Sequence, residues 1–166
     1  MTSSDNPKKL ELVVTRIIDA PLELVWQAWT EPERVVRWWG PKDYTAPFCK
    51  IDLREGGKYI FCMRAPDEQG GQDSYTSGIY LKIIAMERLE FTQGLSDKDG
   101  NRIDPAQLGM PPDFPREIRT EIVFKPKGNM TELIITEYGW MPGQMYVYSL
   151  AGMHQSIDKL IESLTA

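Results

Sequence analysis

The segment QMYVYSLAGMHQSIDKLIESL, residues 144–164, is the longest periodic stretch in the chain. Its large apolar residues recur three or four positions apart, at Tyr146, Leu150, Met153, Ile157, Leu160 and Leu164. This spacing predicts an amphipathic α-helix with one apolar stripe. At about 1.5 Å of rise per residue the helix is roughly 30 Å long. Because no other segment is long enough to pair with it as a second helix, we expect it to cover a broad sheet.

The chain ahead of this helix supplies the strands of such a sheet. Residues 10–18 form a first β-rich run, and residues 22–29 and 31–38 then predict two short amphipathic helices. Six further strand-like runs follow, over residues 48–53, 58–64, 74–85, 88–93, 118–125 and 130–138. Consecutive runs joined by tight turns predict an antiparallel meander, with the first strand pairing at an edge. The expected fold is therefore of the α+β class, a seven-stranded antiparallel sheet curved around the long helix.

We expect one domain over residues 10–166, preceded by a disordered tail over residues 1–9. The region 94–117 contains four prolines and shows neither a helical nor a strand period. A segment of this kind inside a compact domain is usually a lid or a mobile excursion. The sequence therefore predicts a loop here that differs in character from the tight turns elsewhere.

Composition excludes several classes of function. The net charge of −5 argues against nucleic-acid binding, which requires a basic surface. No apolar run approaches the length of a membrane span, and residues 1–7 show neither the basic nor the apolar part of a signal peptide. We therefore expect a cytoplasmic protein, a monomer or weak homodimer without membrane insertion. Its Cys49 and Cys62 would be reduced there, although their position in neighbouring strands leaves a disulfide open.

Catalytic and metal-binding patterns are nearly absent from the sequence. A single histidine, His154, excludes a histidine-based metal cluster, and there is no Cys-x-x-Cys, Gly-x-Ser-x-Gly, phosphate-loop or dinucleotide-binding pattern. We expect no metal and no cofactor. His154, at the margin of the helix stripe, and Glu137, in the last strand, are the two candidates for a general base. For both residues we favour the alternative, a solvated or paired surface group.

Aromatic and methionine residues suggest a cavity between the helix and the sheet. A long helix on a curved sheet is difficult to pack solidly, and methionine adapts to irregular apolar volumes. The alternative is that these residues are ordinary core, which we favour for the tryptophans of the two short helices. The candidate ligand-binding residues are Trp39, Phe61, Met63, Ile79, Phe91, Thr120, Met145, Ser149 and Met153.

Several motifs resemble those of a known superfamily. The segments RIIDAP (residues 16–21), VWQAWT (residues 25–30) and WWGP (residues 38–41) are similar to the amino-terminal signature of START-like (SRPBCC) domains. More narrowly, they resemble the group related to the carboxy-terminal domain of the activator of the heat-shock protein 90 ATPase. The resemblance extends over residues 10–164 and implies a helix-grip fold. Met153 stands where many relatives have a tryptophan, which would leave more room beside the helix.

The resemblance does not imply a single activity, because such relatives bind lipids or hormones, act as aromatase/cyclases, or bind a chaperone. Our leading hypothesis is a non-enzymatic carrier or sensor of a small hydrophobic molecule. The first alternative is a protein-interaction module that acts on a chaperone in the stress response. The second is a lyase, hydrolase or cyclase that uses His154 or Glu137 in the same cavity.

Overall fold

The structure is a computed structural model, and it describes residues 8–165. Most of the predicted tail, residues 1–7, lies outside the described residues. The α-helices, strands and short 3-10 helices (η) follow one another as β1 (Leu10–Ile18), α1 (Leu22–Thr30), α2 (Pro32–Val35), β2 (Thr45–Ile51), β3 (Lys58–Arg64), η2 (Asp67–Gln69), β4 (Asp73–Ile84), β5 (Arg88–Ser96), η3 (Pro105–Leu108), β6 (Ile118–Lys127), β7 (Met130–Trp140) and α3 (Gln144–Leu164). The predicted order of one strand, two short helices, six strands and a long helix is confirmed.

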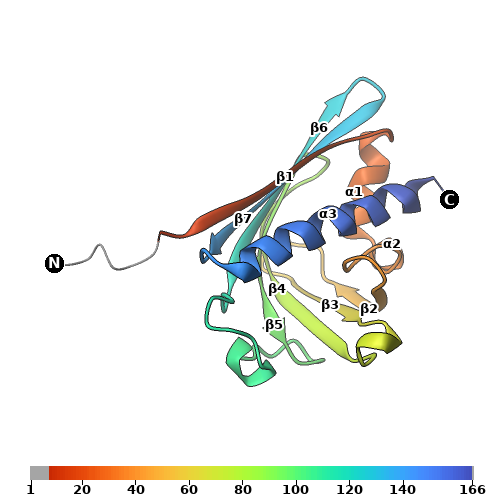
Figure 1. The fold of residues 1–166 in the computed structure, drawn as a ribbon. Helices are drawn as coiled ribbons and strands as arrows, with labels where there is room; N and C mark the ends of the chain where they lie inside the picture. Colours follow the sequence, from red (N-terminus) through yellow and green to blue (C-terminus); the bar gives the residue numbers. More distant parts are fainter. Residues whose placement is uncertain (1–7, 166) are drawn as a thin grey trace.

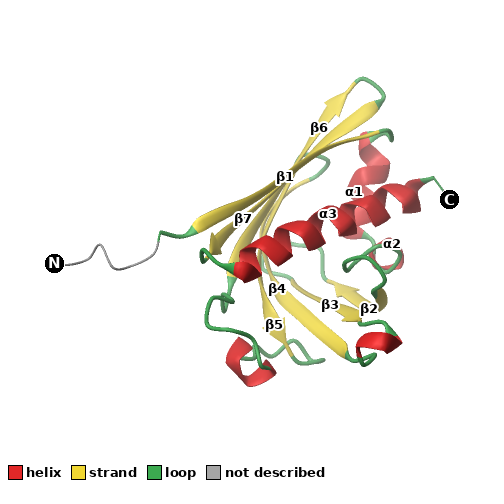
Figure 2. Ribbon diagram, in the orientation of Figure 1, coloured by secondary structure: helices red, strands yellow, loops and turns green. Residues whose placement is uncertain are grey.

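The strands form one seven-stranded antiparallel sheet in the order β1-β7-β6-β5-β4-β3-β2. Strands β2 to β7 are a meander, and β1 pairs with β7, which brings the first strand beside the last one. Figure 1 shows α3 crossing the concave side of the curved sheet, with α1 and α2 near its carboxyl end. Figure 2 shows the resulting two layers, a sheet and the helices that cover it. The predicted helix-grip architecture is confirmed.

The core lies under the carboxyl half of α3. Ile157 and Leu160 are completely buried there, whereas Tyr146, Leu150 and Met153 at the amino half are only partly buried. Aromatic rings fill the space between the carboxyl half, the short helices and the sheet, and the core residues among them are Trp26, Trp29, Trp38, Tyr59, Phe61, Phe91 and Phe124. The carboxyl half of the apolar stripe therefore enters the larger core, whereas its amino half packs against a smaller cluster formed by Leu12, Val14, Ile118 and Trp140.

Strand β4 departs from the predicted pattern. The sequence predicts Ile79 as a ligand-binding residue, but Ile79 lies on the outer face with 41% of its surface exposed. The inner face instead carries Gly78 and Tyr80, both buried. A register shift between Tyr80 and Lys82 then reverses the alternation, so that Ile83 packs against the core. Assigning Ile79 to the ligand-binding face was wrong, because one strand face does not continue through a bulge.

The two cysteines lie in paired strands but on opposite faces. Cys49 is opposite Phe61 and packs against the core, whereas Cys62 is opposite Phe48. Side chains on opposite faces of a sheet cannot be bridged without moving the backbone, so an intramolecular disulfide between them is excluded. Both thiols are free.

The region 94–117 is more structured than its sequence indicates. Strand β5 continues to Ser96, and η3 follows with its first turn capped by the side chain of Asp104. An ion pair of 2.9 Å joins Arg102 to Glu117, and another of 2.8 Å joins Arg116 to Asp104. Within the described part of the chain, none of the helices has the length and hydropathy needed to traverse a bilayer.

Candidate ligand-binding cavity

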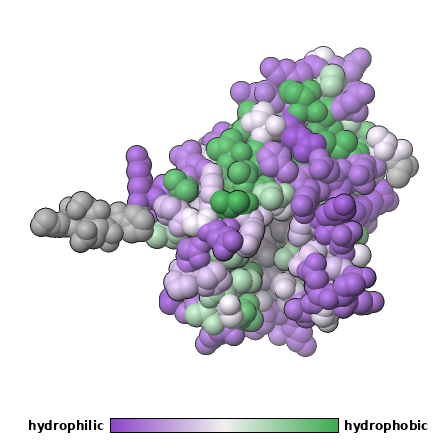
Figure 3. Space-filling model, in the orientation of Figure 1, coloured by the Kyte–Doolittle hydropathy of each residue, from purple (hydrophilic) through white to green (hydrophobic). Residues whose placement is uncertain are grey.

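A cavity of about 840 Å³ separates the amino half of α3 from the concave face of the sheet. It opens to solvent below the helix, where Figure 3 shows the surface hollowed. Its walls are mostly apolar, and its volume falls in the range of small-molecule sites. The cavity thus occupies the region in which the apolar stripe of α3 is only partly buried.

Small residues on α3 create this space. The helix residues that line the cavity are Met145, Tyr148, Ser149, Gly152, Met153 and Ser156. Their spacing of three and four defines a stripe that is displaced by about one position from the apolar stripe predicted from the sequence. Ser149, Gly152 and Ser156 form the middle of this stripe, and their short side chains cannot reach the sheet. The short side chains of this stripe therefore contribute to the empty volume under the helix.

The sheet side of the cavity carries a polar row in a largely apolar surface. Thr120 of β6 lies opposite Glu137 of β7, and the hydroxyl of Thr120 donates a hydrogen bond of 3.3 Å to Oε1 of Gln93 on β5. Gln93 and Glu137 both line the cavity, while Thr120 is buried between them. Polar groups of this kind orient a ligand that apolar burial holds in place.

Glu137 is the unusual member of this row because it is a carboxyl group with only 3% of its surface exposed. Burial raises its pKa from the ordinary value of 4.5 to about 7, since the charged form loses its hydration. The indole of Trp140 donates a hydrogen bond of 3.0 Å to Oε1, which favours the charged form and opposes this shift. A buried carboxyl group with a raised pKa in a cavity is typical of a functional site.

Two loops form the rim of the cavity, and α3 holds both of them. On one side the ammonium group of Lys159 donates to the carbonyl oxygens of Gly40, Pro41 and Tyr44, at 3.1, 3.3 and 2.8 Å. Burial lowers the pKa of this ammonium group. These bonds fix the residues of one rim to the carboxyl half of the helix.

On the other side the rim is held at the amino end of α3. The backbone N–H of Met145 donates a hydrogen bond of 3.2 Å to the carboxylate of Asp113. The adjacent Phe114 packs edge-on against Trp140 with ring centroids 5.8 Å apart. An acidic side chain at a helix amino terminus satisfies a free N–H and interacts favourably with the helix dipole. The loop that the sequence left without structure is thus the second wall of the cavity.

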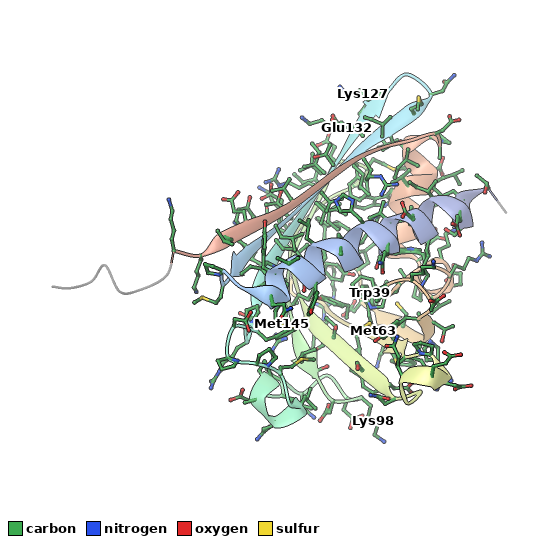
Figure 4. The ribbon with its side chains drawn as sticks, in the orientation of Figure 1. Trp39, Met63, Lys98, Lys127, Glu132 and Met145 are labelled. Carbon is green, nitrogen blue, oxygen red and sulfur yellow. The ribbon has the colours of Figure 1, made fainter. Side chains whose placement is uncertain are left out.

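The structure brings together five of the nine residues expected to bind a ligand. Trp39, Met63, Met145, Ser149 and Met153 line the cavity. In Figure 4, Trp39 and Met63 lie below α3, and Met145 lies at its first turn.

The other four expected residues do not line the cavity. Phe61, Phe91 and Thr120 face the concave side but are buried in the packed sheet surface, and Ile79 lies outside. The two candidate general bases are also separated, because Glu137 lines the cavity whereas His154 is exposed on α3 and does not. The structure therefore does not assemble these two residues into one catalytic pair.

Sequence reasoning missed several residues of the site. Among them are Gln93, Trp140 and the loop residues Leu108, Met110 and Phe114. The three loop residues are apolar within a polar, proline-rich segment, and this contrast was a usable signal. The small residues of α3 at the spacing of a helix face were another. No local pattern marks Gln93, because its role depends on the neighbouring strands.

Comparison with known proteins identifies the family. The family described as Activator of Hsp90 ATPase homolog 1-like protein matches residues 19–165. The chain belongs to this family. No curated protein shows significant sequence similarity to the chain. The resemblance noted in the amino-terminal motifs is thereby confirmed over most of the domain.

Solved structures share the fold of this Activator of Hsp90 ATPase homolog 1-like chain. A protein from Nitrosomonas europaea is 26% identical, with 94% of each chain covered and a TM-score of 0.74. The AHSA1 protein from Silicibacter pomeroyi is 21% identical, covering 94% of this chain and 98% of its own, with a TM-score of 0.72. The AHSA1-like protein from Aeromonas hydrophila is 20% identical, covering 94% and 92%, with a TM-score of 0.70. Because the proteins from Silicibacter pomeroyi and Aeromonas hydrophila are only 21% and 20% identical to this chain, their similarity shows a common fold alone.

Proposed function

We propose that this protein binds a small, mostly apolar molecule in the cavity beneath α3 and acts as its carrier or sensor in the cytoplasm. The observation that carries the proposal is the mostly apolar hollow of about 840 Å³ between α3 and the concave face of the sheet. A purely structural domain gains stability by filling such a volume, because an empty one forfeits dispersion contacts. The presence of this unfilled volume therefore favours a ligand-binding role over a purely structural one.

The lining suits a ligand that binds by burial. Each 100 Å² of apolar ligand surface removed from water contributes about 2.5 kcal/mol. Met63, Met145 and Met153 line the cavity, and their flexible side chains can adjust to ligands of different outline. The polar row on the sheet would then orient a molecule that the apolar walls retain.

Binding of Nile red, an uncharged fluorescent dye, tests the proposal. Ser149→Phe extends an aromatic ring into the hollow, whereas Val147→Phe places the same ring on the solvent side of α3, where Val147 is 59% exposed. We expect the native protein and Val147→Phe to bind the dye alike, and Ser149→Phe to bind it at least tenfold more weakly. Equal binding by all three proteins would contradict the proposal.

A second candidate function follows from the family description, which names an activator of a chaperone ATPase. In this case the protein would be an interaction module that acts on a chaperone in the stress response. The ATPase rate of a purified Hsp90-type chaperone, measured with increasing amounts of this protein, tests the candidate. A saturable rise that persists in Ser149→Phe would favour the chaperone function, and an unchanged rate would contradict it.

A further inference from the structure

We infer that the cavity selects an uncharged ligand whose polar end donates a hydrogen bond, such as a hydroxyl group, and excludes carboxylates, with Glu137 as the group that discriminates. This inference rests on the proposed function, because it assigns the chemical class of the ligand to the same cavity. It depends on the position of Glu137 in the wall, on the partners of its two oxygens, and on the charges around the cavity.

The carboxyl group of Glu137 has one oxygen committed and one available. Oε1 accepts the hydrogen bond from Trp140, and among the described residues no hydrogen-bond donor is paired with Oε2. The side chain is almost wholly buried yet lines the cavity, so water reaches this oxygen only through the cavity. Oε2 is therefore available to accept a hydrogen bond from a donor placed in the cavity, such as the hydroxyl group of a ligand.

Gln93 supplies the complementary function nearby. Its Oε1 accepts a hydrogen bond from Thr120, which leaves its amide N–H groups to the cavity. Glu137 and Gln93 lie on strands that flank β6, two strand spacings or about 10 Å apart. Because their long side chains project from the same face, the polar end of a ligand lying over Thr120 meets an acceptor on one side and donors on the other. A hydroxyl group can both donate and accept, and so fits this arrangement.

The charges around the cavity oppose an anionic ligand. Among the described residues that line it, the one cation is Lys98, which is exposed and lies at the far rim in Figure 4. Asp73 and Asp97 line the same cavity, and Glu137 lies within it. A carboxylate placed beside Glu137 would meet a like charge in a poorly hydrated site, where repulsion is much stronger than in water.

The remaining groups that face Glu137 do not alter this conclusion. Leu12 lies opposite on β1 and Thr120 opposite on β6, and neither carries a charge. From β3 the phenol of Tyr59 stays neutral because burial raises its pKa, an effect that Arg102 opposes and to which Glu137 adds a smaller increase. On the helix side the cavity is lined by the phenol of Tyr148 and the hydroxyl of Ser149. Glu137 is therefore the group that changes charge near pH 7 in the inner part of the cavity.

Two ligands with the same ring system test the inference. 1-Naphthol and 1-naphthoate are used to displace Nile red at pH 8, where naphthol is neutral and naphthoate and Glu137 are charged. We expect the native protein to prefer naphthol, and Glu137→Gln to reduce the naphthol-to-naphthoate preference about tenfold, because the variant keeps the acceptor for Trp140 but loses the charge. Glu132→Gln is the matched control, since Glu132 lies on the same strand and pairs with Lys127 at the hairpin end away from the cavity (Figure 4).

The native protein offers a second measurement that requires no variant. Lowering the pH from 8 to 6 protonates Glu137 while naphthoate stays charged, so the preference for naphthol should fall in the native protein and stay constant in Glu137→Gln. If Nile red binds but the preference does not change with the variant or with pH, the inference is wrong and the proposed function remains. If Nile red does not bind the native protein at all, both are wrong.

Discussion

The indole Nε1 of Trp140 donates a hydrogen bond of 3.0 Å to Oε1 of Glu137, three residues earlier in the chain. In a regular strand these two residues would point to opposite faces. Between them Gly139 adopts a positive φ of 107°, and the pairing of β1 with β7 shifts register between Leu10 and Glu11. This bulge turns Trp140 to the concave side, where it meets both Glu137 and Phe114. One irregularity thus links the buried carboxyl group to the loop that forms the cavity rim.

The raised pKa of Glu137 predicts a stability that decreases as pH rises. The folded protein retains the proton up to about pH 7, whereas an unfolded chain releases it near pH 4.5. The stabilisation is therefore complete below pH 4.5 and is lost between pH 4.5 and 7, a loss on the order of 3 kcal/mol. Glu137→Gln cannot release a proton, so its free energy of unfolding relative to the native protein should be higher at pH 8 than at pH 5.

Urea unfolding at pH 5 and pH 8 measures this difference, with Glu132→Gln as the control for loss of one carboxylate from β7. Equal pH dependence of the native protein and Glu137→Gln would show that the carboxyl group titrates normally.

Met153→Trp should fill part of the cavity. Met153 is partly buried and lines the hollow, so an indole in its place extends into empty volume. We expect about tenfold weaker Nile red binding and no fall in the melting temperature, since the new ring gains contacts that the methionine lacks. His154→Trp, on the exposed side of the same turn, should bind the dye as the native protein does. Full binding by a stable Met153→Trp would place the dye elsewhere.

Lys159→Met should loosen one rim of the cavity. The methionine retains the apolar length of the side chain but leaves the carbonyl oxygens of Gly40, Pro41 and Tyr44 without their donor. Hydrogen bonds to a charged group contribute more than neutral ones, and we expect a loss of about 2 kcal/mol in the free energy of unfolding.

Amide hydrogen exchange locates this effect, because the backbone N–H of Lys42, which is bonded to Gln155, should exchange faster in Lys159→Met. Lys125→Met on the exposed side of β6 is the control. If the two variants have equal stability, the three bonds to Lys159 contribute nothing measurable.

Asp113→Ala should release the opposite rim. It removes the carboxylate that accepts from the backbone N–H of Met145 and leaves the amino end of α3 uncapped. Loss of such a cap costs about 1 kcal/mol. We expect faster cleavage by trypsin after Arg116, which is exposed in the same loop. Asp99→Ala removes an equal charge from that loop and should be cleaved at the native rate, and similar rates for both variants would contradict the role of Asp113.

Local patterns determined most of the fold. The spacing of apolar residues in α3 and the alternation in β3 and β6 persist over whole elements, and the predicted bounds of α3 and β3 agree with the structure. Such periodicities are set by backbone geometry, so they can be read without knowing the partner of each element. Trp26, Trp29 and Trp38 were likewise correctly assigned to the core.

Only the tertiary structure decided which residues form the cavity. Ile79 is as apolar as a core residue, but the bulge of β4 places it outside, and the polar Glu137 lies inside. Phe61 and Phe91 face the concave side of the sheet, but neighbouring core side chains cover them. Ser149 and Gly152 border the cavity because their side chains are short or absent. Whether a side chain meets a neighbour or a void depends on the register and curvature of strands distant in sequence, and no local pattern contains that information.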